Sequence, residues 1–310
     1  MIVFGPIPSR RLGRSLGINN VTHKVCDYSC VYCQLGKTDF MSIKRRDFFS
    51  TGEIYKEVAE KVHKIQKKGE IIDYITFVPE GEPTFDINLG KTIERLKKFK
   101  IKIAVITNSS LIWIEEVRND LMKADLVSLK IDTVFENIWK RMNRPHGILR
   151  LNRIIQGIEE FASNFRGKLI TETMLVNGLN DTVESIYKTA EFVKNIHPSK
   201  AYILIPTRPP AEDYVKSPGL NIITAAHQIF SSIVGDTELL IENEGTNFSF
   251  SLNAEKELIS IIAVHPMQKK AVEEFLSRSN SGWDLVNNLI TKNVLSRTEY
   301  SGNTYFIKSK

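Results

Sequence analysis

Hydrophobic and polar positions follow two alternating patterns over residues 15–205. Six apolar runs rich in β-branched residues are typical of strands and lie at 15–21, 72–78, 101–107, 125–131, 168–176 and 200–205. Between them, apolar residues recur every three or four positions and predict helices at 50–68, 90–99, 113–123, 135–142, 148–162 and 181–196. Ser50 and Glu53 form a capping box at the start of the first helix. Strands that alternate with helices predict parallel βαβ units with right-handed crossovers, so the expected fold class is α/β.

The pattern changes near residue 255, which predicts one domain at 1–250 and a smaller one at 251–310. Helical periodicity at 254–264, 268–277 and 283–291 is followed by two strand-like runs around a Ser-Gly-Asn turn, between residues 294 and 308. Three helices followed by a hairpin are typical of a winged-helix-like domain, which binds nucleic acid or serves peptide binding and dimerisation. The residues expected to contact RNA or DNA there are Trp283, Lys292, Arg297 and Tyr305.

The composition is that of a globular protein, since 42% of the 310 residues are hydrophobic and 25% are charged. No apolar run approaches the ~18 residues of a membrane span, and the apolar start of the chain is too short for a signal peptide. We therefore expect a cytoplasmic protein that does not contact membranes. The net charge of +6 is uneven, because residues 1–50 carry eight Lys or Arg against three Asp, and residues 265–310 carry seven against four acidic residues. Such basic segments suit either nucleic acid or an acidic protein.

All three cysteines of the chain, Cys26, Cys30 and Cys33, fall within eight residues. Thiolates at such short spacing indicate a metal site, because an odd number of clustered cysteines does not form a disulfide framework. Zinc would need a fourth ligand, which His23 offers. A [4Fe–4S] cluster would keep one iron open to a ligand that is not cysteine. The composition of the segment leaves both alternatives open.

The motif Cys26-x3-Cys30-x2-Cys33, with Tyr32 directly before the third cysteine, resembles the signature of the radical SAM superfamily. That resemblance implies a partial (β/α)6 barrel and one [4Fe–4S] cluster, whose fourth iron is chelated by S-adenosylmethionine. It also implies the reaction, in which reductive cleavage of S-adenosylmethionine gives a 5′-deoxyadenosyl radical that abstracts hydrogen from a substrate. Because the chain has no fourth cysteine, an auxiliary cluster and reactions through a thiyl or methylcysteine intermediate are excluded.

Polar groups at the ends of the predicted strands complete the expected site, since ligands gather at the carboxyl ends of parallel strands. The run at 79–83 has the sequence Pro-Glu-Gly-Glu-Pro and resembles the Gly-Gly-Glu-Pro motif of the superfamily, with Glu80 in place of the first glycine. By that resemblance, Glu82 and the backbone at Gly81 hold the amino group of S-adenosylmethionine. The further residues that we assign to the cofactor or the substrate are Tyr32, Asn108, Ser128 and Lys130.

Two features of the later strands are less determined by the pattern. Alternation along the fifth strand shows that Glu172 and Met174 share one face, but not whether that face looks inward. Arg208 follows the sixth strand; it either reaches toward the substrate or is an arginine of an exposed loop, and we expect the exposed loop position.

The resemblance extends to a largely prokaryotic branch of the superfamily that is grouped with the wyosine-type, tRNA-modifying enzymes. It rests on the opening stretch at 5–18 and on the segment at 34–36, and it spans about residues 5–250. Wyosine-forming enzymes use cysteines outside the signature for a second cluster, so their specific reaction is not expected here. The expected substrate is RNA, above all tRNA; the alternatives are a peptide or protein substrate, and a cluster-containing DNA-binding sensor without turnover. The expected protein partner is an electron donor of flavodoxin or ferredoxin type, which competes with RNA as the explanation for the basic residues at 10–14 and 44–46.

Overall fold

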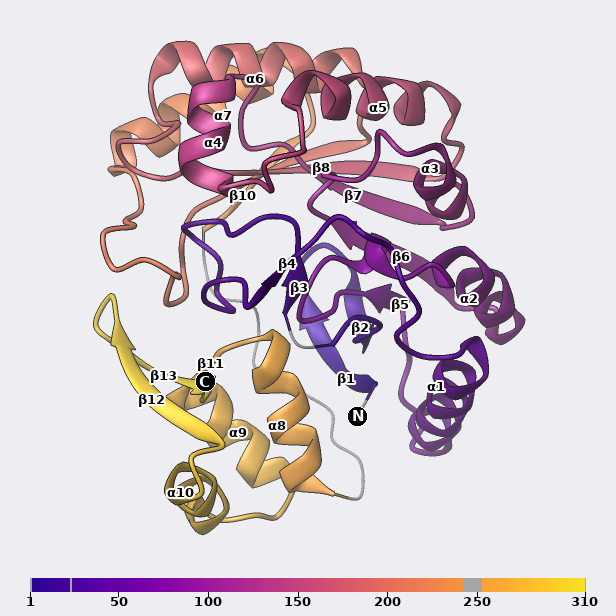
Figure 1. The fold of residues 1–310 in the computed structure, drawn as a ribbon. Helices are drawn as coiled ribbons and strands as arrows, with labels where there is room; N and C mark the ends of the chain where they lie inside the picture. Colours follow the sequence, from indigo (N-terminus) through magenta and orange to yellow (C-terminus); the bar gives the residue numbers. More distant parts are fainter. Residues whose placement is uncertain (1, 23, 242–252, 310) are drawn as a thin grey trace.

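The computed structural model describes residues 2–22, 24–241 and 253–309. Its largest element is an eight-stranded sheet in which β1 is antiparallel to β2 and all later neighbours are parallel. In spatial order the strands are β1 (Val3–Ser9), β2 (Gly13–Ile18), β5 (Tyr74–Phe77), β6 (Lys102–Thr107), β7 (Leu126–Lys130), β8 (Lys168–Met174), β9 (Lys200–Leu204) and β10 (Thr237–Leu240). Figure 1 shows the sheet curled into part of a barrel, as predicted.

Helices cover the outer face of this sheet, where one large apolar core lies between the two layers. They are α1 (Thr51–Lys67), α2 (Leu89–Leu96), α3 (Glu115–Leu121), α4 (Glu136–Asn143), α5 (Leu151–Asn164), α6 (Val183–Asn195) and α7 (Leu220–Ile233), with 3₁₀ turns η1 (Pro83–Phe85) and η2 (Lys97–Phe99). The six predicted strands and the helices between them are confirmed. Strands β1 and β10 and helix α7 were not predicted, because β1 contains a glycine and two prolines, β10 is short, and α7 has no charged residue to mark a polar face.

The amino-terminal end of the barrel is closed by the turn between β1 and β2. Leu12 in this turn packs against inward-facing residues of the strands, namely Ala104, Leu126, Ile170, Tyr202 and Leu240. Since side chains alternate across a strand, the same face carries polar groups nearer the carboxyl ends of the strands. The barrel therefore has an apolar floor, and in its upper interior polar and charged groups lie among apolar side chains.

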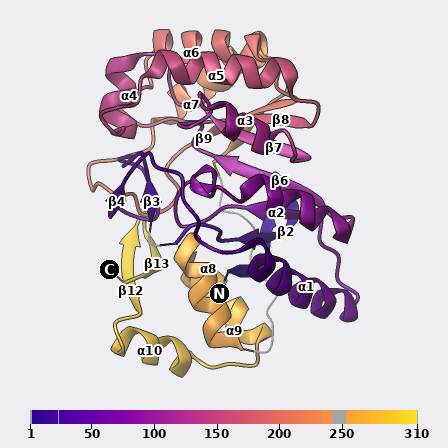
Figure 2. The same ribbon diagram turned by 45° about the vertical axis from the view of Figure 1, so that its right-hand side comes forward.

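Residues 253–309, here called the C-terminal unit, lie beside β1 and the cysteine segment (Figures 1 and 2). The elements are α8 (Ala254–Val264), β11 (Met267–Gln268), α9 (Lys269–Arg278), α10 (Trp283–Thr291), β12 (Leu295–Tyr300) and β13 (Asn303–Lys308), with sheet order β11-β13-β12. Three helices and a hairpin thus occur where they were predicted, and β11 adds a third strand. The unit shares its apolar core with Phe4 and Ile7 of β1. The predicted boundary at 250 and 251 lies outside the described residues, and the winged-helix-like classification stays a prediction.

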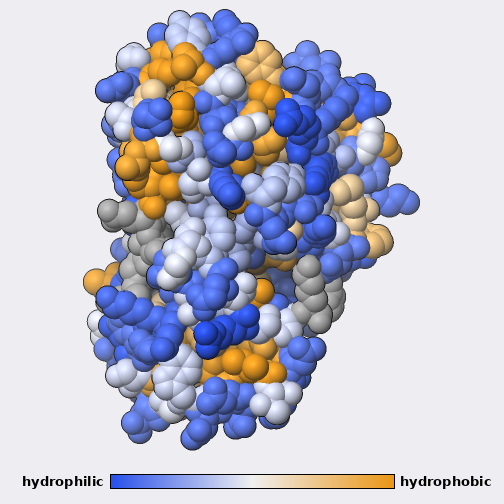
Figure 3. All heavy atoms as spheres, turned by 90° about the vertical axis from the view of Figure 1, so that its left-hand side faces the viewer, coloured by the Kyte–Doolittle hydropathy of each residue, from blue (hydrophilic) through white to orange (hydrophobic). Residues whose placement is uncertain are grey.

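The surface on the face that Figure 3 shows is largely hydrophilic, with hydrophobic residues in separate patches. Among the described helices, none is long and apolar enough to cross a membrane.

Candidate functional site

A cavity of about 310 Å³ lies at the carboxyl ends of the parallel strands. Its wall combines the cysteine loop with the ends of β5 to β9 and the segments that follow them. The residues assigned from sequence that line it are Cys26, Cys30, Tyr32, Cys33, Gly81, Glu82, Asn108 and Lys130. A cavity of this volume is within the range of small-molecule and cofactor sites.

The cysteine loop presents three free, half-buried thiols to this cavity. Cys26 lies in β3 (Val25–Cys26), which pairs with β4 (Phe40–Met41). The side-chain amide of Asn108 donates to Sγ of Cys26 and that of Asn143 donates to Sγ of Cys30, both at 3.4 Å. Burial raises the pKa of Cys30 to about 12, and burial with the neighbouring Asp27 carboxyl raises the pKa of Cys26 well above its usual value. Such thiols lose their protons when a metal binds.

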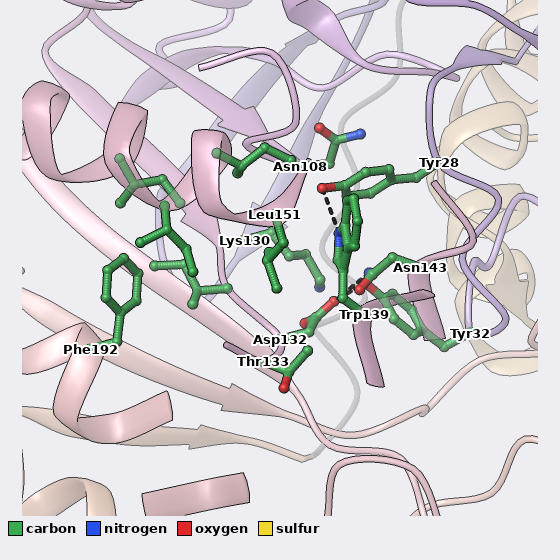
Figure 4. A pocket seen from close by; sticks show the side chains of 14 residues that line it. Tyr28, Tyr32, Asn108, Lys130, Asp132, Thr133, Trp139, Asn143, Leu151 and Phe192 are labelled. Atoms are coloured by element: carbon green, nitrogen blue, oxygen red, sulfur yellow. Dashed lines mark hydrogen bonds between the residues drawn. The ribbon is translucent and has the colours of Figure 1, made fainter. Parts of the chain in front are cut away.

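A buried hydrogen-bond network anchors the cysteine loop to the segment after β7 and to α4. The Tyr32 hydroxyl donates to the Asp132 carboxylate, and Nδ2 of Asn143 donates to the same oxygen at 2.9 Å. Figure 4 shows these three side chains directed toward one another, beside Trp139, whose Nε1 donates to the Tyr28 hydroxyl at 2.9 Å. The space next to them is about 30 Å³, which is too small for a cofactor. Tyr32 therefore helps to anchor the cysteine loop, in addition to lining the larger cavity.

The carboxylate of Glu82 is buried and already hydrogen-bonded inside the protein. Its Oε1 accepts from the backbone N–H and the hydroxyl of Thr84 at 3.1 and 2.7 Å, and from the Thr107 hydroxyl at 2.6 Å. Its Oε2 accepts from the backbone N–H of Asn108 at 2.7 Å. Burial raises the pKa of Glu82, although these hydrogen bonds act in the opposite direction. Glu82 thus ties the end of β5 to the end of β6, and Oε2 keeps a lone pair for a further donor.

Gly81 has an additional role that the motif does not show. A Cβ at this position would lie 2.1 Å from the carbonyl oxygen of Val25. The same carbonyl accepts from the backbone N–H of Glu82 at 3.1 Å. Gly81 therefore lets the turn after β5 touch the strand that carries Cys26, in addition to leaving space in the cavity.

The inner face of β8 carries Glu172, which answers the question left open by alternation. Glu172 accepts from Oγ of Ser128 at 2.6 Å and forms an ion pair with Arg11, 161 positions away. Burial acts to raise the pKa of Glu172, but Arg11 and Lys130 outweigh it, so this pKa is lowered. Ser128 is not among the residues that line the cavity, contrary to expectation. On the inward face of β7, Ser128 is the next residue below Lys130, nearer the floor of the barrel. Its hydroxyl contacts Glu172 and not the cavity.

Two lysines line the cavity without an ion pair among the described residues. Nζ of Lys24 is buried and has no hydrogen-bond partner in that part of the chain. The ammonium of Lys130 lies 5.1 Å from the centre of the Tyr32 ring. Lys24 was not predicted, although it lies only two residues before Cys26. Arg11 and Asn143 were not predicted because nothing local in the sequence marks residues that reach a site from a distant element.

The zinc alternative depends on His23, which lies outside the described residues. Within them, no three His, Cys, Asp or Glu side chains are gathered as the ligands of a single metal ion would be. The thiolates of a four-iron cluster need not converge on one atom, because each binds an iron of its own.

Comparison with known proteins agrees with this geometry. The family model described as the radical SAM superfamily matches residues 20–193, more than half of the chain. The chain is 48% identical over 99% of its length to a UPF0026 protein of Methanocaldococcus jannaschii, of which it covers 96%. It is 26% identical over 66% of its length to a Streptococcus pneumoniae protein named for dual-specificity RNA methyltransferase activity, of which it covers 58%.

Two solved structures share the fold. A radical SAM methyltransferase from Sphaerobacter thermophilus aligns with a TM-score of 0.57 at 14% identity, over 74% of this chain and 67% of that one. TYW1 with a lysine-pyruvate adduct aligns with a TM-score of 0.51 at 15% identity, over 71% of this chain and 73% of that one. With the cysteine loop, the partial barrel and the family match in agreement, the chain belongs to the radical SAM superfamily and is an enzyme of that superfamily.

Proposed function

We propose that this radical SAM enzyme modifies a nucleotide in RNA. The observation that carries its chemistry is the convergence of three cysteines on one cavity, with Glu82 and Lys130 on the other walls. Membership of the superfamily implies a [4Fe–4S] cluster and S-adenosylmethionine. When bound, these groups supply reductive cleavage of S-adenosylmethionine and a carbon radical that takes hydrogen from a substrate.

The residues that line the cavity fit this pair of groups. Cys26, Cys30 and Cys33 would hold three irons, and Oε2 of Glu82 would accept from the amino group of S-adenosylmethionine. Nζ of Lys24 is buried without a hydrogen-bond partner among residues 2–22, 24–241 and 253–309, and because such an ammonium is costly, Lys24 favours an anion in the cavity. A cluster held by three thiolates and the carboxylate of S-adenosylmethionine both provide negative charge.

The protein itself orients these groups and limits access of water. Leu12 and the strand residues around it close the floor of the barrel. Above them, the ion pair of Arg11 with Glu172 and the ammonium of Lys130 provide fixed charges at the cavity wall. Such a site reacts with little solvent rearrangement, because its dipoles and charges are held by the fold.

RNA is the substrate class that the comparisons favour, through the likeness to a protein named as an RNA methyltransferase. The basic residues at 10–14 and 44–46 offer a partner less positive charge than their number suggests. Arg11, Arg14 and Arg45 form ion pairs with Glu172, Glu70 and Asp120. Lys44 and Arg46 are exposed, close after β4, the strand that pairs with the Cys26 strand. RNA and an acidic electron donor both suit this position.

The test combines a chemical and a cellular measurement. Anaerobically reconstituted protein should release 5′-deoxyadenosine from S-adenosylmethionine when dithionite is added, and Cys30→Ala should abolish the release. In a strain that lacks the gene, mass mapping of tRNA and rRNA nucleosides should show one modification lost. The wild-type gene should restore it and the Cys30→Ala gene should not.

Three results would contradict parts of this proposal. Complete RNA modification in the deletion strain, with a mass change in a peptide or protein instead, would favour the protein substrate. Stoichiometric zinc without iron uptake would exclude the cluster. Iron uptake without 5′-deoxyadenosine would favour a sensor.

A further inference from the structure

We infer that the C-terminal unit is a positioning part of the cofactor cavity, holding three loops at its mouth in one arrangement. The inference rests on the proposed function, because the cavity concerned is the proposed site of S-adenosylmethionine. It concerns residues that bind no ligand themselves and act through the loops they contact.

The first loop held by the unit follows β9. The Tyr305 hydroxyl donates to the carbonyl oxygen of Thr207 at 2.7 Å, and the Tyr300 hydroxyl donates to that of Pro206 at 3.2 Å. Nε2 of Gln268 donates to the Tyr305 hydroxyl at 2.8 Å, which fixes this group within the unit. Pro206 and Thr207 both line the cavity. The path of this loop is therefore set by two tyrosines of the C-terminal unit.

The second loop is the turn after β5, which contains Glu80. The ammonium of Lys308 in β13 contacts Oε2 of Glu80 at 2.8 Å, while Nδ2 of Asn19 donates to Oε1 at 3.0 Å. Glu80 lines the cavity and occupies the position where the superfamily motif has its first glycine. A glycine could not make either contact. The departure from the motif thus coincides with a contact to the C-terminal unit.

The third loop is the cysteine loop itself, at Gln34, the residue after Cys33. Oε1 of Gln34 accepts from Nη1 of Arg208 at 2.8 Å, and its Nε2 donates to the carbonyl oxygen of Val264 at 3.1 Å. Nη2 of Arg208 lies 3.0 Å from Nε2 of His265. Arg208 is therefore half-buried between two elements, not an exposed loop arginine as expected from the sequence. This chain of contacts joins the cysteine loop, the loop after β9 and the end of α8.

The barrel residues that join these loops to the C-terminal unit line the cavity, namely Gln34, Glu80, Pro206, Thr207 and Arg208. No described residue of the C-terminal unit lines it. The unit therefore influences the cavity through barrel residues that it contacts, and it fixes the three loops of the cavity rim relative to one another. Because the contacts of the loop after β9 and of the cysteine loop share Arg208 and neighbouring backbone, loss of one should loosen the other.

The same contacts limit the residues left for nucleic acid. Tyr305 is buried and holds Thr207, and the Trp283 ring packs against Phe306 with centroids 5.8 Å apart. Of the four residues expected to contact RNA or DNA, Lys292 and Arg297 are exposed. The structure thus assigns the aromatic members of that set to packing and to the rim.

The test uses full-length protein with Tyr305→Phe, which removes one hydroxyl and keeps the ring. The matched control is Tyr187→Phe on α6, the same chemical change at a tyrosine that is 44% exposed. Hydrogen exchange of the metal-free protein should become faster at residues 204–210 and also at 31–36 in Tyr305→Phe. In reconstituted protein, iron content should be unchanged while affinity for S-adenosylmethionine falls roughly twofold to tenfold, as expected for a lost hydrogen bond.

A double-mutant cycle with His265→Ala extends the test. If the rim behaves as one unit, the combined loss of affinity should be smaller than the product of the two single losses. Faster exchange confined to 204–210, with wild-type affinity, would overturn the inference and leave the C-terminal unit as simple packing. If wild-type protein binds no S-adenosylmethionine, the proposed function fails, whereas the exchange measurement still decides whether the rim is coupled.

Discussion

Glu82 shows how a residue assigned to a cofactor can also be part of the fold. Its carboxylate has donors from Thr84, Thr107 and Asn108 around it before any ligand enters the cavity. The motif had predicted that the Glu82 carboxylate binds the amino group of S-adenosylmethionine. The structure shows a carboxylate that joins two strand ends and keeps limited capacity for a ligand.

We predict that Glu82→Gln lowers the free energy of unfolding even without cofactor. The amide would place N–H groups opposite at least one donor, the backbone N–H of Asn108 or the hydroxyls on the other oxygen. An unsatisfied buried group of this kind costs about 1–3 kcal/mol. Urea unfolding of the metal-free protein measures this loss. Wild-type stability together with weaker binding of S-adenosylmethionine would mean that the carboxylate serves the cofactor alone.

Among the elements, the short strand β3 depends on a neighbour without a side chain. The turn after β5 reaches the carbonyl oxygen of Val25 only because Gly81 has no Cβ. The position of Cys26, the next residue, is thereby coupled to the turn that carries Glu82. Loop and turn are expected to move together when either is displaced.

Gly81→Ala should therefore reduce iron incorporation as well as stability. The added Cβ would meet the backbone oxygen of Val25 at 2.1 Å, and backbone on both sides must shift to accept it. Iron content after anaerobic reconstitution and the melting temperature measure the two effects. Gly147→Ala is the control, because no atom lies within 4 Å of a Cβ there. Normal iron content in Gly81→Ala would show that the cysteine segment does not depend on this contact.

For the whole molecule, one buried ion pair connects the C-terminal unit to the start of the barrel. Glu257 of α8 pairs with Lys61 of α1, and Oε1 of Glu257 accepts from the backbone N–H of Gly5 at 3.0 Å. Burial lowers the pKa of Lys61, although Glu257 acts to raise it. The pair lies next to the apolar core that the unit shares with β1.

Glu257→Gln should lower the unfolding free energy by about 3–5 kcal/mol, because it removes the negative charge that pairs with the buried Lys61. Adding Lys61→Met to this variant should recover most of the loss, since the amide oxygen can still accept from Gly5. Urea unfolding of the four proteins gives the coupling. Additive effects of the two substitutions would exclude the pair as a link between the unit and the barrel.

The loss in Glu257→Gln should also depend on pH. A lysine whose pKa is lowered in the native state releases its proton before the unfolded chain does, so stability rises with pH between the lowered value and the usual 10.5. Since Glu257 acts to raise the pKa of Lys61, this pKa should be lower still in Glu257→Gln, and the difference from wild type should shrink with rising pH between the two native-state values and stay constant above them. A difference in unfolding free energy that grows with pH would contradict a lowered pKa of Lys61 in the variant.

Much of the fold could be predicted from the local pattern of apolar residues, because strands and helices impose periods of two and 3.6 residues on buried positions. The six parallel strands, the helices between them and the capping box of Ser50 and Glu53 were all predicted in this way and are confirmed. The spacing of Cys26, Cys30 and Cys33 likewise indicated a metal site, and the superfamily was predicted from the resemblance of this motif to its signature.

The tertiary structure alone decided which groups meet in the cavity. Alternation places Glu172 on one face of β8 but does not show that this face looks inward, and Arg11 reaches it across 161 positions. The contact of Gln34 with Val264 spans 230 positions and has no local signal. Such pairs depend on how the barrel curls and where the C-terminal unit packs, which is determined by burial summed over the whole chain. Residue types and their spacing thus determined the chemistry of this protein, and packing between distant segments determined the shape of the site in which it occurs.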